Sequence, residues 1–207
     1  MSTINFIVLA FDDSIDKLEN TIQSIALCKY EQLCISVVTN SENIDKATEI
    51  LNKNEELCLA PLFFNKFPFG VPTFCLGFEK GKIRNCDALN SLIRASYEYC
   101  DIFVFIQSGD IVLENYPKKI IEALNEGVGM VGVIYGDYII DNIPIYSEPF
   151  SRDKMINTWY PYGYTIPKYV LESEGLFPNI NNTENIHLLK ILDKYMAIHI
   201  PEFVIQK

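Results

Sequence analysis

Five consecutive apolar residues, Ile102 to Ile106, constrain the fold of this chain more than any other feature. An uninterrupted apolar run of this length is typical of a strand that is buried on both faces of a sheet. The run ends abruptly in the polar residues Gln107, Ser108, Gly109 and Asp110. Ligands of open α/β sheets bind at the carboxyl ends of the strands. The residues after the run therefore predict a ligand site.

The first fifty residues alternate between β-rich segments and amphipathic segments. Residues 4–11 and 33–38 are predicted strands, and Asp13 or Ser14 is a candidate cap for the helix between them. A second helix is predicted from Ile44 to Leu51. The order strand, helix, strand, helix indicates an α/β fold with a parallel sheet and right-handed crossovers.

Further elements follow along the chain. Residues 57–64 are compatible with a strand, whereas residues 67–78 are rich in Pro, Gly and Phe and are expected to be irregular. The segment from Asp137 to Pro167 is aromatic and interrupted by prolines, and Trp159 to Tyr164 within it is expected to form a loop. The remaining predicted elements are helices over 82–99, 116–125, 170–177 and from Thr183, and strands over 127–135 and 197–205. A length of 207 residues suits a single domain, with halves of about 1–110 and 111–207.

The net charge of the chain limits the classes of partner that it is expected to bind. A formal net charge of −10 argues against nucleic acid as the main partner and against an anionic membrane surface. Positive charge gathers just before the central run, at Lys80, Lys82 and Arg84. Because this basic cluster precedes the polar strand end, the sequence indicates a phosphorylated ligand.

Cysteine usage and the N-terminus indicate the compartment. The six cysteines form no CxxC pair, and several lie in apolar runs, where a small buried side chain is expected. The N-terminal apolar block lacks a basic flank and is too short for a signal or a transmembrane segment. We therefore expect a soluble, cytoplasmic protein.

Five segments in order resemble the inverting family 2 glycosyltransferases, which have the GT-A fold. INFIVLAFDD resembles their first strand and donor-binding turn, and LCISVVTNSENIDKATEIL their second strand and helix. GKIRNCDALNSLIRASYEYCDIFVFIQSGDIV is similar to the stretch that leads into their DxD metal motif. VGVIYGDYIIDN resembles a strand near the acceptor, and GYTIPKYVLESEGLFPNINNTENIHLLKIL the segment that ends in their Glu-Asp pair. The resemblance implies a GT-A-like, Rossmann-type mixed sheet with helices on both faces. It also implies a nucleotide-sugar-binding first half and an acceptor-side second half.

The donor-binding residues are expected at the strand ends. The resemblance places Phe11 and a neighbouring carboxylate against the base and ribose, and an amide such as Asn40 can pair with a uracil edge. Lys82 and Arg84 can neutralise the diphosphate, Arg84 by a bidentate contact. The whole set is Phe11, Asp12, Asp13, Asn40, Lys82, Arg84, Asn90, Gln107, Ser108 and Asp110. Structural alternatives stay open: a helix cap for Asp13, a turn residue for Asn40, packing for Asn90 and a solvated helix start for Lys82 and Arg84.

The acidic motifs of the family are degenerate in this chain. Thr39 and Asn40 stand where the second strand would end in two carboxylates. Gln107-Ser108-Gly109 stands in place of DxD, and only Asp110 follows. Mn²⁺ or Mg²⁺ can bind one or two carboxylates together with ligand phosphates, which makes Asp110 the candidate metal ligand. The alternative is that Asp110 caps the following turn.

The catalytic base is expected near the start of the last helix. Glu184 and Asn185 stand where the family has its Glu-Asp pair, so Glu184 and His187 are the candidate bases. They can equally be a first-turn residue and a surface residue of the helix. His199 alternates with apolar residues in a predicted strand and is expected to be packed. Asp137 and Trp159 are the acceptor-side candidates, with core packing as their alternative.

Two functions of different class follow. The first is a glycosyltransferase that moves a sugar from a nucleotide-diphosphate donor, a UDP-sugar, to an unknown glycan, lipid or protein acceptor. The second is a catalytically silent GT-A-like binding or scaffolding module, favoured by the loss of carboxylates at three places. Sugar-phosphate nucleotidyltransferases rank lower, because LAFDDSID lacks their glycine-rich loop. A flavodoxin-like binding domain lacks the same support.

Overall fold

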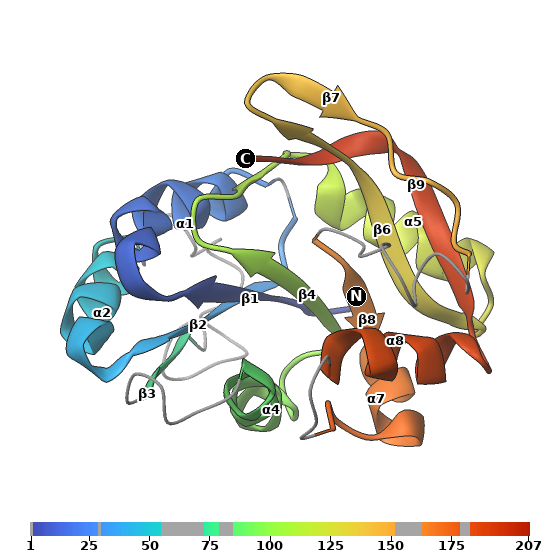
Figure 1. Cartoon of the computed structure of the whole chain (residues 1–207), viewed down its shortest axis with the longest axis horizontal. Coiled ribbons are helices and arrows are strands. Elements are labelled where there is room, and N and C mark those ends of the chain that lie inside the picture. Colours follow the sequence, from blue (N-terminus) through green and yellow to red (C-terminus); the bar gives the residue numbers. More distant parts are fainter. Residues whose placement is uncertain (1, 29, 55–72, 79–84, 152–162, 179–182) are drawn as a thin grey trace.

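One mixed sheet runs through the computed structural model, which describes residues 2–28, 30–54, 73–78, 85–151, 163–178 and 183–207 (Figure 1). The strands in this part of the chain are β1 Ile4–Ala10, β2 Leu33–Asn40, β3 Thr73–Phe78, β4 Ile102–Gln107, β5 Ile111–Val112, β6 Val131–Ile140, β7 Ile143–Ile145, β8 Thr165–Pro167 and β9 Met196–Gln206. Their order is β3-β2-β1-β4-β8-β6-β9-β5, with β7 paired to β6. Strands β1 to β4 are parallel, β8 is antiparallel to β4 and β6, and β6 is parallel to β9. The carboxyl ends of β1, β2, β4 and β6 therefore share one edge.

Helices cover both faces of this sheet (Figure 1). Their bounds are α1 Leu18–Ala26, α2 Ile44–Lys53, α4 Asn85–Ser96, α5 Tyr116–Glu126, α7 Lys168–Glu174 and α8 Thr183–Leu192. One buried cluster joins the sheet to α1, α2 and α5, and the other joins it to α4, α7 and α8. The predicted mixed sheet with helices on both faces is confirmed.

The central apolar run packs into both clusters. Val104 and Ile106 belong to the cluster under α1, α2 and α5, whereas Phe103 and Phe105 belong to the other. All five side chains from Ile102 to Ile106 are buried. A strand that is covered on both sides needs apolar residues at every position, which explains the unbroken run.

Several predicted elements differ from the structure. Residues 73–78 form β3 rather than irregular chain, and β8 (Thr165–Pro167) is a strand that the sequence did not predict. Strand β6 begins at Val131 and continues to Ile140, past the predicted end at residue 135. A 3-10 helix, η1 (Asp12–Lys17), precedes α1, whose N-cap is Lys17 without a side-chain capping bond. The predicted caps for α1 are therefore wrong, because the chain turns once more before the α-helix begins.

Other expectations concern segments outside the described residues. The possible strand over 57–64 and the start of the predicted helix at residue 82 lie there. The side chains of Cys28, Cys34, Cys86 and Cys100 are buried, as expected for these four. No helix in the described ranges is long and apolar enough to cross a membrane.

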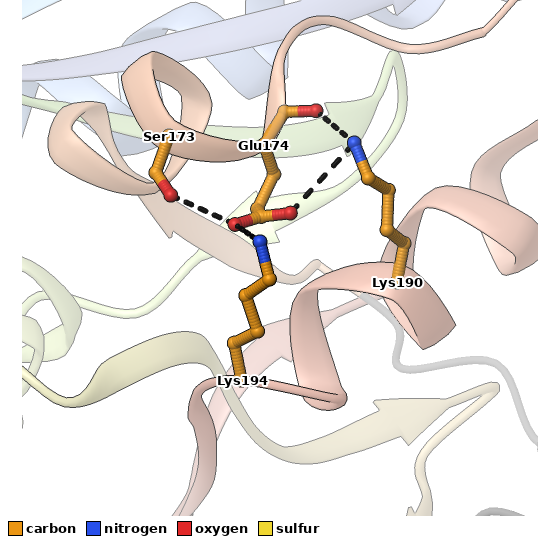
Figure 2. A network of polar contacts seen from close by, with 4 residues as sticks. All are labelled: Ser173, Glu174, Lys190 and Lys194. Atoms are coloured by element: carbon orange, nitrogen blue, oxygen red, sulfur yellow. Dashed lines mark hydrogen bonds and ion pairs between the residues drawn. The ribbon is translucent and has the colours of Figure 1, made fainter.

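Glu174, the last residue of α7, ties this helix to α8 (Figure 2). Its side chain is 1% exposed, and its carboxylate accepts hydrogen bonds from Lys194 Nζ (2.8 Å) and Ser173 Oγ (2.7 Å). Lys190 Nζ donates to the Glu174 carbonyl oxygen at 2.5 Å. The hydrogen bond from Lys194 is the main cause that lowers the pKa of the Glu174 carboxyl below its ordinary value of 4.5. The ionised carboxylate thereby holds α8, and with it the helix start at which Glu184 lies.

Candidate functional site

A tight turn closes the central strand. The Asp110 side chain is fully buried, and its carboxylate accepts the Gln107 backbone N–H at 2.7 Å. The Asp110 N–H donates to the Gln107 carbonyl at 3.1 Å, and Gly109 has a φ of 101°. Asp110 thus serves a turn, as the alternative for this residue held, but it is the turn of residues 107–110 that precedes it and not the one that follows. The Gln107 side chain is exposed, and its Oε1 lies 3.4 Å from Lys207 Nζ.

Hydrogen bonds attach this turn to the end of β1 and to α1. Ser108 N–H donates to the Leu9 carbonyl (2.8 Å), and Ser108 Oγ donates to the Ser14 carbonyl (2.5 Å). The Gly109 N–H donates to Thr21 Oγ1 at 2.8 Å. The polar ends of β1 and β4 therefore lie together, as the sequence predicted for neighbouring parallel strands.

Around this junction lie other predicted donor residues. Phe11 is half-buried against the cluster under α4, and Asp12 and Asp13 open η1 directly after β1. Asn40 is the last residue of β2 and is 6% exposed. Asn90 makes a structural contact instead. Its side-chain amide donates to the Phe177 carbonyl (2.9 Å) and accepts a hydrogen bond from the Phe177 N–H (3.0 Å). This reciprocal pair is the packing alternative for Asn90, because it joins α4 to the chain after α7.

The residues at this edge also test the expected metal. Within the described ranges, no three His, Cys, Asp or Glu side chains lie close enough together to hold a metal ion. The buried Asp110 carboxylate is part of its own turn. The described residues at the end of β4 thus offer a divalent metal no cluster of acidic ligands.

His187 lies in the core rather than on the helix surface. Its side chain is 1% exposed, and its ring lies 4.8 Å from the Phe177 ring. Nε2 is buried and has no hydrogen-bond partner among the described residues. Burial, followed by the charge of Lys190, lowers the pKa of His187 from 6.5 to about 4. The surface position that was the alternative for His187 is therefore wrong, and a ring in this environment accepts a proton poorly, which speaks against the predicted role as a base.

Asp137 pairs with a histidine that the sequence assigned to packing. The Asp137 side chain is 5% exposed, and its Oδ1 lies 2.7 Å from His199 Nε2. The same oxygen accepts the Ser147 N–H at 2.8 Å. The His199 ring stacks on Tyr135, with centroids 5.2 Å apart and an interplanar angle of 20°. A buried carboxylate thus holds one nitrogen of a partly exposed imidazole.

Strand β9 is irregular where it passes Asp137 of β6. Gly136, Asp137 and Tyr138 pair with Ile200, Phe203 and Ile205, so the extra residues of both register shifts lie in β9. Bulges of this kind redirect side chains and occur often beside active sites. Gly136 fits closely here, because a Cβ on it would lie 2.7 and 2.8 Å from the two methyl groups of Val204.

The fit at Gly136 gives a stability prediction. We expect Gly136→Ala to lower the free energy of unfolding by about 1–3 kcal/mol, because the new methyl overpacks the core against Val204. Val204→Ala removes both close contacts, so the double variant should lose less than the sum of the two single losses, by about 0.5 kcal/mol or more. Urea unfolding of the four proteins measures this coupling. Strictly additive losses would contradict the contact.

Sequence reasoning missed His199, although an Asp and a His on separate predicted strands were visible. Its alternation with apolar residues in AIHIPEFVI indicated packing, and no spacing rule links residue 199 to residue 137. Parallel pairing of β6 with β9 brings the two together. Lys82, Arg84 and Trp159 lie outside the described residues. Glu184 is the second residue of α8.

Comparisons with known proteins bear on the fold. No protein-family model matches this chain, and no curated protein matches it either. Residues 1–349 of S. aureus TarS superpose with a TM-score of 0.70 at 15% identity, over 99% of this chain and 60% of that one. The same fragment in complex with UDP-GlcNAc gives a TM-score of 0.67 at 15% identity, over 99% of this chain and 58% of the other.

A second solved structure has a related sheet. It is 4-diphosphocytidyl-2C-methyl-D-erythritol synthase from Anaerococcus prevotii, with a TM-score of 0.62 at 14% identity, over 97% of this chain and 87% of the other. The chain spans about three fifths of the TarS fragment that it matches. At these identities the likeness shows the fold: the chain has the GT-A-like α/β fold that its sequence predicted.

Proposed function

We propose that this protein transfers a sugar from a UDP-sugar to a hydroxyl group of an acceptor. The observation that carries the proposal is the likeness of 99% of the chain to the TarS fragment, which was also solved with UDP and with UDP-GlcNAc. The junction of β1 and β4 supports it, because polar groups gather there at the ligand-binding edge of an open α/β sheet.

Such a transfer makes three demands on the protein. The diphosphate leaving group needs positive charge, the acceptor hydroxyl needs a base, and the nucleoside needs to be positioned. Phe11, which follows β1, and Asn40, which ends β2, are the proposed contacts of the nucleoside. Lys82 and Arg84 remain the proposed partners of the diphosphate, since they precede α4 in a chain that is otherwise acidic.

Nucleotide titration tests the proposal. We expect UDP and UDP-GlcNAc to bind in isothermal titration calorimetry more tightly than uridine, which lacks the diphosphate. Arg84→Ala should weaken UDP binding about tenfold, because it removes a charge-assisted contact to phosphate. Arg94→Ala is the matched control, since Arg94 is exposed on α4. Absence of binding by any UDP-, GDP- or dTDP-sugar, with or without Mn²⁺, would overturn the proposal.

The same titration examines the metal. Asp110 as a ligand of Mn²⁺ or Mg²⁺ stays a prediction. UDP affinity that rises with Mn²⁺ and is lost in Asp110→Ala would support it. Equal affinity with and without Mn²⁺ would leave Asp110 to its turn alone.

A catalytically silent binding module is the second candidate. It is favoured by the buried Asp110 carboxylate, which serves the turn in place of an exposed acidic motif. Nucleotide binding without release of UDP from UDP-GlcNAc would favour this module over a transferase.

A further inference from the structure

The proposed transfer needs a catalytic base. None of the residues predicted for this role whose side chains the structure describes fits it. Asn185 replaces the aspartate that the resemblance places in the Glu-Asp pair, and an amide does not take up a proton at neutral pH. His187 is buried against Phe177, and its pKa is lowered. Glu184, the other predicted base, has a side chain outside the described part of the structure. Among the described side chains, the base has to be a group other than His187.

The pair formed by Asp137 and His199 has the chemistry of such an acceptor. A buried carboxylate at 2.7 Å from Nε2 favours the tautomer that carries its proton on Nε2. This tautomer leaves the lone pair of Nδ1 available, and the described residues place no hydrogen-bond donor on that nitrogen. The side chain of His199 is 25% exposed, whereas Asp137 is almost fully buried. The imidazole is thus both oriented and accessible.

The position of the Asp137–His199 pair along the strands also fits a role at the proposed site. Val104 of β4 and Ile134 of β6 both pair with Thr165 of β8. Gln107 and Asp137 each lie three residues further toward the carboxyl end. The pair is therefore level with the turn that closes β4. Tyr135 and Ala197 pack in the cluster of α4, α7 and α8. Asp137 and His199 each follow one of them by two residues, and side chains two residues apart in a strand point to the same face. The pair therefore lies on the face of the sheet that α8 covers.

We propose that His199 is the general base of the sugar transfer and that Asp137 is its positioning residue. The inference rests on the proposed function. Nδ1 takes the proton of the acceptor hydroxyl, and the oxygen forms a bond to the anomeric carbon of the donor sugar. The bond from that carbon to the diphosphate oxygen breaks, and its electron pair leaves with UDP. The imidazolium then passes its proton to water.

Hydrolysis of UDP-GlcNAc tests the role, with water as the acceptor. We expect His199→Gln to lower kcat for UDP release by about 10²–10⁴-fold. KM for UDP-GlcNAc and the calorimetric affinity for UDP should stay within about twofold, because the base does not hold the donor. Met196→Gln is the matched control, since Met196 is exposed on the same strand. An unchanged kcat in His199→Gln would overturn the proposal.

Asp137→Asn tests the positioning role without relying on activity. The wild-type protein should show the Nε2–H tautomer of His199 in ¹⁵N spectra of labelled histidine. In Asp137→Asn the amide can donate to Nε2, so we expect the Nδ1–H form to increase and kcat to fall with it. A wild-type Nδ1–H tautomer would overturn the inference.

The outcomes separate the two proposals. If the protein binds UDP but releases none from UDP-GlcNAc, the proposed nucleotide site stands and the proposed base is overturned. If it binds no nucleotide, both proposals are overturned. Turnover that is equal in wild type, His199→Gln and Asp137→Asn would retain the transferase and reduce the pair to a structural contact.

Discussion

Replacing Phe105 with alanine is expected to lower the free energy of unfolding by about 3–5 kcal/mol, the largest stability loss that we predict. The side chain is 5% exposed and lies near the carboxyl end of β4. Its ring stacks on Tyr164 at 4.9 Å and meets Phe177 edge-on at 5.5 Å. The substitution removes both ring contacts and leaves a cavity between the sheet and its helices. Urea unfolding followed by circular dichroism measures the change.

Two further variants set the scale for this loss. Tyr146 is 70% exposed, so Tyr146→Ala should cost less than about 1 kcal/mol. Phe105→Leu retains most of the buried volume and should fall between the two. If Phe105→Ala cost no more than Tyr146→Ala, the aromatic cluster would not contribute to stability as the structure indicates.

Acid should destabilise the protein through His187. Burial lowers the pKa of this histidine from 6.5 to about 4 in the folded state. The unfolded chain therefore takes up a proton near pH 6.5, whereas the folded chain does so only near pH 4. Stability from the neutral ring is present above pH 6.5 and decreases as the pH falls, by about 3 kcal/mol at pH 4.

Comparison with His187→Leu isolates this contribution. Leucine does not titrate, so the difference in unfolding free energy between wild type and variant should change by about 2 kcal/mol between pH 7 and pH 5. Glu174 affects stability over a different pH range. Because its pKa is lowered, its contribution to the free energy of unfolding is lost only as the pH falls below 4.5. Ile186→Leu, an exposed change on the same helix, should follow the wild-type curve. Parallel curves for wild type and His187→Leu would show that the ring titrates as it does in water.

The local sequence was sufficient for strands β1, β2 and β4 and for most helices. The run from Ile102 to Ile106 predicted a strand covered on both faces, and the structure confirms this. It was not sufficient for β3 and β8. Strand β8 has three residues and pairs with β4 and β6, which are far from it in sequence. Pairing partners that distant, rather than local propensity, define so short a strand.

The features of the candidate site also fall into those that the sequence predicted and those that it did not. The sequence placed polar residues after β1 and β4, because the chain switches from apolar to polar at Asp12 and at Gln107. It left two roles open for Asp110, and the structure shows the carboxylate in the turn. It left His187 as a candidate base or a surface residue of its helix, whereas packing against Phe177 buries the ring.

By itself, then, the sequence determined the α/β class, the central buried strand and the edge at which polar residues gather, since each of these depends on neighbours along the chain. Only the tertiary structure decided that Asp137 meets His199, because 62 residues separate them and parallel pairing of β6 with β9 brings them within 2.7 Å. Hydrogen-bond geometry and burial depend on such long-range contacts, and composition and periodicity do not encode them.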